Sequence, residues 1–149
     1  VCENAPMDLF ARLLVPIDFS EITPRVVTMA RRLLAPDGRC TLLHVVETLP
    51  TVMEGAYGVY AHRRDIEDIK RLSHDKLAQL AAEQRDPRVD VMVREGKPAQ
   101  AIVETAAEEH ADAIVIGSHG RSRLDHLLVG SVTERVLRKA TCHVFMVRG

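Results

Sequence analysis

The chain has 149 residues, of which 46% are hydrophobic and 28% are charged, a composition typical of a single soluble globular domain. Its formal net charge is −1, so the overall field gives no reason to expect nucleic acid or an anionic membrane as a partner. Aromatic residues make up only 3%, which argues against a stacking surface for single-stranded nucleic acid. No apolar run is long enough to cross a bilayer.

The first part of the chain lacks the basic start and apolar core of a signal peptide. We expect residues 1–10 to form a flexible N-terminal tail and residues 11–149 to form the folded domain. The odd number of cysteines and their spacing fit neither a disulfide framework nor a zinc site; they are Cys2, Cys40 and Cys142. A reducing compartment is the simplest setting for such a chain, so we expect a cytoplasmic protein.

The first segments predict two buried strands around one helix. An apolar run at 13–17 predicts the first strand. The following helix is predicted to be capped by Ser20 or Thr23 and to be stopped by residues 36–38, Pro-Asp-Gly. The run 40–46 predicts the second strand. The expected inward face of the helix comprises Ile22, Val26, Met29, Ala30 and Leu33.

The middle of the chain predicts a loop, a long helix, a strand and a shorter helix. Residues 48–60 contain proline and glycines and predict a long loop, and residues 62–84 predict a helix. Its expected apolar stripe comprises Ile66, Ile69, Leu72, Leu77 and Leu80. Alternation around valines at 88–94 predicts a strand with one wetter face. Residues 96–98 then turn into a helix whose expected inward residues are Ala99, Ile102, Val103 and Ala106.

The last segments predict a buried strand at 113–116, a helix at 131–139 and a closing strand at 143–147. Strands and helices therefore alternate along the whole chain, which is typical of a doubly wound α/β protein with a five-stranded parallel sheet and helices on both faces. Right-handed crossovers favour the strand order 3-2-1-4-5.

The segment between the fourth strand and the last helix has the pattern of an anion site. Gly117 and Gly120 follow the strand, and Gly130 with Ser131 opens the helix. Glycines let backbone N–H groups come close to a bound group, and a helix start adds unpaired donors and a partial positive charge. This combination predicts a site for an anion, most often phosphate. The S-x-x-E spacing from Ser131 to Glu134 also predicts a capping box.

The predicted strand order brings a second segment to the same place. The first and fourth strands are neighbours in that order, and their helices leave on opposite faces of the sheet. The ligand crevice of such sheets lies at the carboxyl ends of those strands. Asp18 follows the first strand and Gly117 ends the fourth, so we expect them to meet at one site.

Several segments together resemble the universal stress protein family: residues 16–20 (Pro-Ile-Asp-Phe-Ser), 43–45 (Leu-His-Val), 96–99 (Gly-Lys-Pro-Ala) and the glycine segment. The resemblance covers nearly the whole chain, from about residue 13 to 148. It implies an adenine nucleotide alpha hydrolase-like fold, with 11–149 as a universal stress protein domain. In that family the pattern G-x2-G-x9-G-[S/T] marks the members that bind ATP, and this chain matches it completely.

The resemblance also implies roles for particular residues around ATP. Asp18 would hold the ribose hydroxyls or assist a divalent metal. The adenine would be enclosed by Pro16, Ile17 and Val45. Ribose and phosphates would meet Ile116, Gly117 and Gly120, and the phosphate tail would meet Gly130, Ser131 and Val132. No further acid is assigned to a metal, so we expect Mg²⁺ to be held mainly by the phosphates.

The resemblance further implies a homodimer formed through residues 143–147, because family members pair this strand with its twin. The same strand would otherwise be an exposed apolar sheet edge, which needs to be covered.

Alternative interpretations remain for single residues. Asp18 could serve only as a turn residue, although we favour ligand contact. Ser131 could cap the helix when the site is empty and bind phosphate when it is occupied. His119 lacks a spaced nucleophile or orienting acid, so we predict no catalytic residue. His44, in an apolar strand, is interpreted as a core histidine with a hydrogen-bond partner.

The sequence therefore favours an ATP-binding module for stress response or signalling. Two alternatives remain open: a slow ATPase or phosphotransferase assisted by His119 or Asp18, and a nucleotide-free subunit that binds a partner protein. The chain has neither G-x-x-x-x-G-K-[S/T] nor G-x-G-x-x-G after the first strand, which argues against a P-loop and a dinucleotide-binding half.

Overall fold

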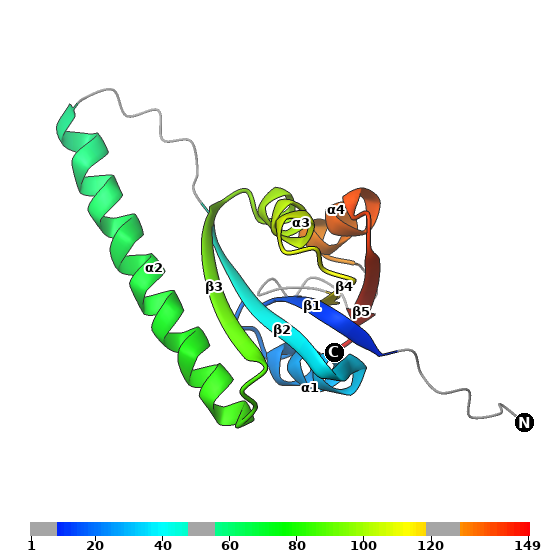
Figure 1. Ribbon diagram of the computed structural model, residues 1–149. Coiled ribbons are helices and arrows are strands. Elements are labelled where there is room, and N and C mark those ends of the chain that lie inside the picture. Colours follow the sequence, from blue (N-terminus) through cyan, green and yellow to red (C-terminus); the bar gives the residue numbers. More distant parts are fainter. Residues whose placement is uncertain (1–8, 48–55, 119–128) are drawn as a thin grey trace, which may run out of the picture.

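The computed structural model describes residues 9–47, 56–118 and 129–149, with only the backbone course for 56–64. In this part of the chain, strands and helices alternate: β1 (Phe10–Pro16), α1 (Thr23–Leu33), β2 (Leu34–Glu47), α2 (Ala56–Gln84), β3 (Val89–Gly96), α3 (Pro98–Glu108), β4 (Ala113–Gly117), α4 (Ser131–Lys139) and β5 (His143–Val147). The strands form one parallel sheet in the order β3-β2-β1-β4-β5 (Figure 1). The predicted fold class and strand order are confirmed.

Helices cover both faces of the sheet because the strand side chains alternate between them. On one face, Leu13 and Val15 of β1 pack with α1 and with Leu77 of α2. On the other face, Leu14 of β1 packs with α3 and with Val136 of α4. Figure 1 shows α1 on the side of the sheet opposite to α3 and α4. No helix in the described ranges is long and apolar enough to cross a membrane.

Helix α1 begins without the predicted side-chain cap. Its N-cap residue is Ile22, which makes no capping hydrogen bond through its side chain. Ser20 is not available because its hydroxyl donates to Asp18 instead, at 2.6 Å. Thr23 lies inside the first turn, with its hydroxyl buried and unpaired among the described atoms. The expected inward face is confirmed except at Met29, which is 36% exposed.

The sequence predicted that Pro36-Asp37-Gly38 stops α1. Instead, this segment forms an irregular start of β2. The helix ends at Leu33 and β2 follows at once. Phe10 of β1 pairs with Leu34, whereas Arg12 pairs with Arg39, so β2 carries extra residues between these pairs, as in a β-bulge. A Cβ on Gly38 would lie 2.9 Å from the carbonyl oxygen of Ala11. Only glycine fits this close approach.

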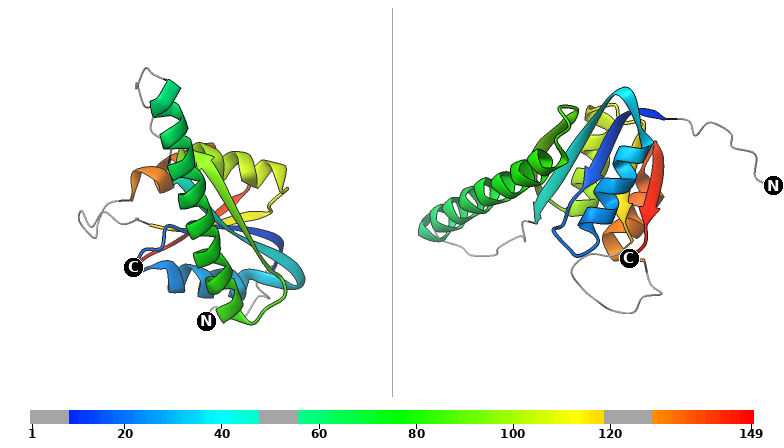
Figure 2. Two further views of the ribbon diagram at one scale, coloured as in Figure 1. Left: turned by 90° about the vertical axis from the view of Figure 1, so that its left-hand side faces the viewer. Right: turned by 90° about the horizontal axis from the view of Figure 1, so that it is seen from below.

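Helix α2 faces the sheet with a different stripe from the one predicted. Ile69 and Leu72 are 47% and 58% exposed, while Leu77 is fully buried. The side that turns inward runs through Ile66, Lys70, Ser73, Leu77 and Leu80. Ile69 and Leu72 lie beside this stripe, on a side of the helix that is exposed. Figure 2 shows that the first part of α2 extends beyond the sheet.

Candidate functional site

The two segments predicted to form the site lie at the same edge of the sheet. Strands β1 and β4 are hydrogen-bonded neighbours, with Leu13 opposite Ala113 and Leu14 opposite Ile114. After β1 the chain continues to α1 on one face, and after β4 it continues to α4 on the other. This arrangement is the switch point of a doubly wound sheet, where the crevice lies at the carboxyl ends of the strands.

The start of α4 is attached directly to the end of β4. Gly130 donates its N–H to the carbonyl of Ser118 at 2.7 Å, and Ser118 donates its own N–H to Val147 at 2.8 Å. The Thr133 hydroxyl donates to the carbonyl of Gly117 at 2.7 Å. The sequence patterns did not indicate these roles for Ser118 and Thr133. Together the bonds hold the helix start against the strand end.

The N-terminus of α4 presents backbone donors toward the end of the strands. The first helical hydrogen bond runs from Glu134 N–H to Gly130 carbonyl, at 2.9 Å. The three N–H groups before it, those of Ser131, Val132 and Thr133, have no acceptor in the described part of the chain. Unpaired N–H groups at a helix start carry partial positive charge and suit an anion. Among the described groups at this end of the sheet, these donors are the ones best suited to an anion.

The predicted capping box is wrong. The N-cap residue is Gly130, in an extended conformation with φ −62° and ψ 149°, so Ser131 is already the first residue of the helix. Its hydroxyl therefore has the wrong position for a cap, because N-cap side chains act from non-helical backbone. Glu134 does not reach back either and instead accepts a hydrogen bond from Arg138 at 2.8 Å.

The segment after β1 forms a tight turn around Asp18. The Asp18 Oδ1 atom accepts hydrogen bonds from the N–H and the hydroxyl of Ser20, at 3.0 and 2.6 Å. This is an Asx-turn, so the turn role considered for Asp18 is observed. Asp18 is half-buried at the carboxyl edge. Contact between Asp18 and a ligand stays a prediction.

The turn is also held from β2. The Ile17 N–H donates to the carbonyl of Leu43 at 2.7 Å. The Ile17 carbonyl lies 2.7 Å from Nδ1 of His44. The expectation that His44 has a hydrogen-bond partner is thus confirmed, and its partner lies next to Asp18.

The other predicted contact residues are placed as follows. Pro16 ends β1 and Val45 lies near the end of β2. Ile17 and Ile116 are buried, at 4% and 5% exposure, in the cores of opposite faces, so their side chains pack mainly against protein. Val132 is half-buried against the core under α4. Gly120 and the histidine considered as a base, His119, lie outside the described residues.

In the part of the chain that the structure describes, protein side chains alone do not form a metal site. No group of three or more His, Cys, Asp or Glu side chains there is placed to hold an ion. Asp18 contributes one carboxylate at the crevice edge. Mg²⁺ is commonly bound through one or two carboxylates plus substrate phosphates.

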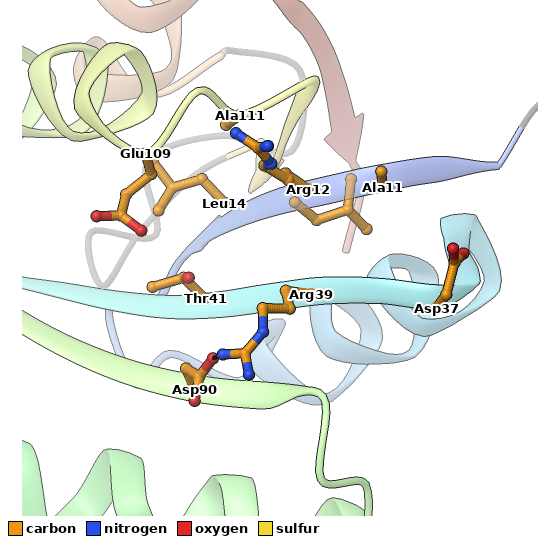
Figure 3. Close-up of a pocket in the computed structure, with 10 residues that line it drawn as sticks. Ala11, Arg12, Leu14, Asp37, Arg39, Thr41, Asp90, Glu109 and Ala111 are labelled. Carbon is orange, nitrogen blue, oxygen red and sulfur yellow. Dashed lines mark hydrogen bonds and ion pairs between the residues drawn. The ribbon is translucent and has the colours of Figure 1, made fainter.

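A hollow of about 420 Å³ lies at the amino-terminal ends of the strands, opposite the candidate site (Figure 3). It is lined by Ala11, Arg12, Leu13, Leu14, Asp37, Arg39, Thr41, Asp90, Glu109 and Ala111. Arg39 of β2 pairs with Asp90 of the neighbouring β3 at 2.7 Å, and both side chains are largely exposed. Cationic and anionic groups are interleaved around this hollow, so it favours no single sign of ligand. The carboxyl ends of β1 and β4, with the N–H donors at the start of α4, are the better candidate.

The sheet order and the N–H donors at its switch point are typical of one class of protein. These are doubly wound α/β proteins in which a helix N-terminus at the carboxyl ends of the strands is suited to an anion. The model of the universal stress protein family matches residues 10–148. The chain belongs to this family. It is 34% identical to universal stress protein A homolog 2 of Coxiella burnetii, over 95% of this chain and 97% of that protein.

Solved structures agree with this assignment. The structure of MJ0577 from Methanocaldococcus jannaschii matches with a TM-score of 0.78 and 27% identity, over 95% of this chain and 97% of that chain. A universal stress protein in complex with cAMP matches with a TM-score of 0.63 and 23% identity, over 95% and 99% of the two chains. At that identity, the second likeness shows the fold alone.

Proposed function

We propose that this universal stress protein binds ATP at the crevice between β1 and β4 and acts as a nucleotide-dependent module in a stress response. The observation that carries the proposal is the set of three N–H groups at the start of α4 that have no acceptor among the described residues. They follow a glycine segment that matches the ATP-binding pattern of the family completely. An anionic tail of phosphates supplies the acceptors that these donors lack.

The remaining residues supply orientation rather than chemistry. Gly130 and Thr133 keep the helix start fixed through their bonds to Ser118 and Gly117. Asp18 stands at the end of the neighbouring strand, where its carboxylate can accept hydrogen bonds from ribose hydroxyls or assist Mg²⁺ held by the phosphates. That a protein of the same fold was solved with cAMP makes the choice among adenine nucleotides an explicit part of the test.

The mechanism we propose is linkage. ATP binds the folded chain and not the unfolded one, so it stabilises the form that holds the site and shifts the population toward it. The proposal includes a homodimer formed through β5. The nucleotide-bound form of the protein is then a dimer. Hydrolysis is not required for such a switch.

Calorimetric titration of ATP with Mg²⁺ into the wild type, Gly130→Val and Thr141→Val tests the proposal. Gly130 has φ −62° and ψ 149°, a backbone that valine adopts readily, so the variant adds bulk at the helix start without backbone strain. Thr141 is exposed beyond the other end of α4 and provides the matched control.

We expect micromolar binding in the wild type and the control, and at least about tenfold weaker binding in Gly130→Val, which is about 1.4 kcal/mol. Weaker binding of AMP than of ATP would show that the phosphate tail contributes. Equal affinities of Gly130→Val and wild type would contradict the proposed phosphate position. ADP formation in the same samples would favour the slow ATPase, and the absence of binding to the wild type would favour the partner-binding subunit.

A further inference from the structure

One imidazole contacts the residues on both sides of Asp18. His44 lies in β2, next to β1 in the sheet. Its Nδ1 atom is 2.7 Å from the carbonyl oxygen of Ile17, the residue before Asp18. Because a carbonyl oxygen only accepts hydrogen bonds, Nδ1 carries the proton and donates it. The contact spans two strands and fixes the backbone at which the turn begins.

The residue after Asp18 packs against the same ring. Phe19 lies with its ring centroid 4.8 Å from that of His44, and the Nζ atom of Lys76 in α2 lies over the Phe19 ring at 5.7 Å from its centroid. Phe19 has a φ of 59°, a left-handed conformation that is uncommon for a bulky residue. Such a conformation persists only when the surroundings over-determine it. Here the surroundings are His44, Lys76 and the core cluster against which Phe19 packs.

We propose that His44 is a positioning residue for Asp18 in the nucleotide site. It acts without touching the ligand: it holds the Ile17 carbonyl and supports the Phe19 ring, so that the backbone of Asp18 has one course. Ser20 then orients the carboxylate through its two bonds to Oδ1. This inference rests on the proposed ATP site. A carboxylate ordered before binding costs less to immobilise when the ligand arrives.

Two substitutions distinguish the effect of the His44 hydrogen bond from the effect of the space that the side chain fills. His44→Leu fills similar space but has no donor for the Ile17 carbonyl. His44→Asn places an amide N–H near the position of Nδ1 and so retains the donor. His110→Leu is the matched control, since His110 also contacts a backbone carbonyl through Nδ1, that of Ala107 at 2.8 Å, but is exposed just after α3.

The first measurement needs no nucleotide. The Ser20 N–H donates to Asp18 Oδ1, so its hydrogen exchange reports how firmly the turn is held. We expect exchange at this amide to be about tenfold faster in His44→Leu, and close to the wild-type rate in His44→Asn and His110→Leu. Unchanged exchange in His44→Leu would overturn the positioning role.

The second measurement asks whether His44 acts through Asp18, using a double-mutant cycle on ATP affinity. We expect His44→Leu to weaken binding about tenfold in the wild-type background and less than about twofold in Asp18→Ala, with His44→Asn restoring most of the loss. Independent effects of the two substitutions, or no rescue by asparagine, would refute the inference. If the wild type binds no adenine nucleotide, the proposed function fails, and the exchange experiment still decides whether His44 positions Asp18.

Discussion

Thr133 shows how a single hydroxyl ties the candidate site to the sheet. Its side chain is buried and donates to the Gly117 carbonyl at 2.7 Å. Thr133→Val keeps the shape and removes this donor, so we expect the free energy of unfolding to fall by about 1–3 kcal/mol, measured by urea denaturation.

Thr28→Val is the matched control for that substitution. The Thr28 hydroxyl also donates to a backbone carbonyl, that of Pro24 at 2.8 Å, but it is exposed on α1. Water replaces the lost bond there, and we expect a change within about 0.5 kcal/mol. Equal losses of unfolding free energy in the two variants would show that the Thr133 hydrogen bond stabilises the fold no more than an exposed one.

Asp86 gives the protein a defined sensitivity to acid. Hydrogen bonds from the Arg88 side chain, and then from its backbone N–H, lower the pKa of Asp86 from 3.8 to about 2. Between these two values the unfolded chain binds more protons than the folded chain, so stability rises with pH. The contribution is complete above about pH 4 and is lost as the pH falls toward 2.

We therefore expect the stability difference between wild type and Asp86→Asn to shrink as the pH is lowered from about 4 to about 2. Thermal unfolding followed by circular dichroism across this range measures it. Asp90→Asn, at the exposed pair with Arg39, controls for the general loss of carboxylate charge. A constant difference between wild type and Asp86→Asn over the range would contradict the assigned pKa.

At the residue scale, the sequence patterns located the segments of the candidate site. They were less successful in predicting what each side chain does there. The S-x-x-E pattern located the start of α4, but the N-cap is Gly130, one residue before Ser131. Asp18 was considered as a turn residue, which the structure shows. The contact between His44 and Ile17 joins residues 27 positions apart, and no local pattern reports such a contact.

At the scale of elements, the sequence predicted the number and type of helices and strands in the described ranges, and several boundaries. The helix at 131–139 and the strand at 143–147 have the predicted limits. The predicted start of β2 was wrong because Pro36-Asp37-Gly38 is typical of a helix end, whereas the pairing with β1 tolerates extra residues there. The prediction for the inward face of α2 was wrong at Ile69 and Leu72 because apolar spacing alone does not reveal which side of the helix faces the sheet.

The orientation of α2 leads to a direct comparison of two leucines. Leu77 is fully buried and Leu72 is 58% exposed, although both belonged to the predicted stripe. We expect Leu77→Ala to lower the free energy of unfolding by about 2–5 kcal/mol, because it leaves a cavity in the core. Leu72→Ala should change it by less than about 1 kcal/mol. Chemical denaturation of both variants tests this, and similar losses would mean that α2 lies differently on the sheet.

At the scale of the whole molecule, the alternation of strands and helices was sufficient to predict the sheet order, because crossover handedness and packing leave few topologies. The order in turn brought Asp18 and Gly117 to one edge before any contact was known. The match of the family model to residues 10–148 agrees with the resemblance that the motifs indicated. The position of a nucleotide remains a proposal because it depends on contacts that backbone topology does not determine.

The two edges of the sheet differ in how they are covered. Figure 1 shows α2 running alongside β3 at one edge, while β5 forms the other. The His143 N–H donates to Asp112 at 3.2 Å, and the Val147 carbonyl accepts from Ser118 at 2.8 Å. In a strand, the backbone groups of alternate residues point to the same side, so those of Val144 and Met146 point away from β4. These outward groups are available for pairing with a second chain.

We therefore expect β5 to pair with its twin in a homodimer and Val144→Pro to produce a folded monomer. Proline removes an N–H that points away from β4, so the pairing inside the chain should survive. Val144→Thr keeps both the backbone donor and the branched shape and should remain dimeric. Sedimentation velocity at micromolar concentration gives the mass, and circular dichroism gives the fold. A dimeric Val144→Pro would place the interface elsewhere, and a monomeric wild type would remove the dimer from the proposed mechanism.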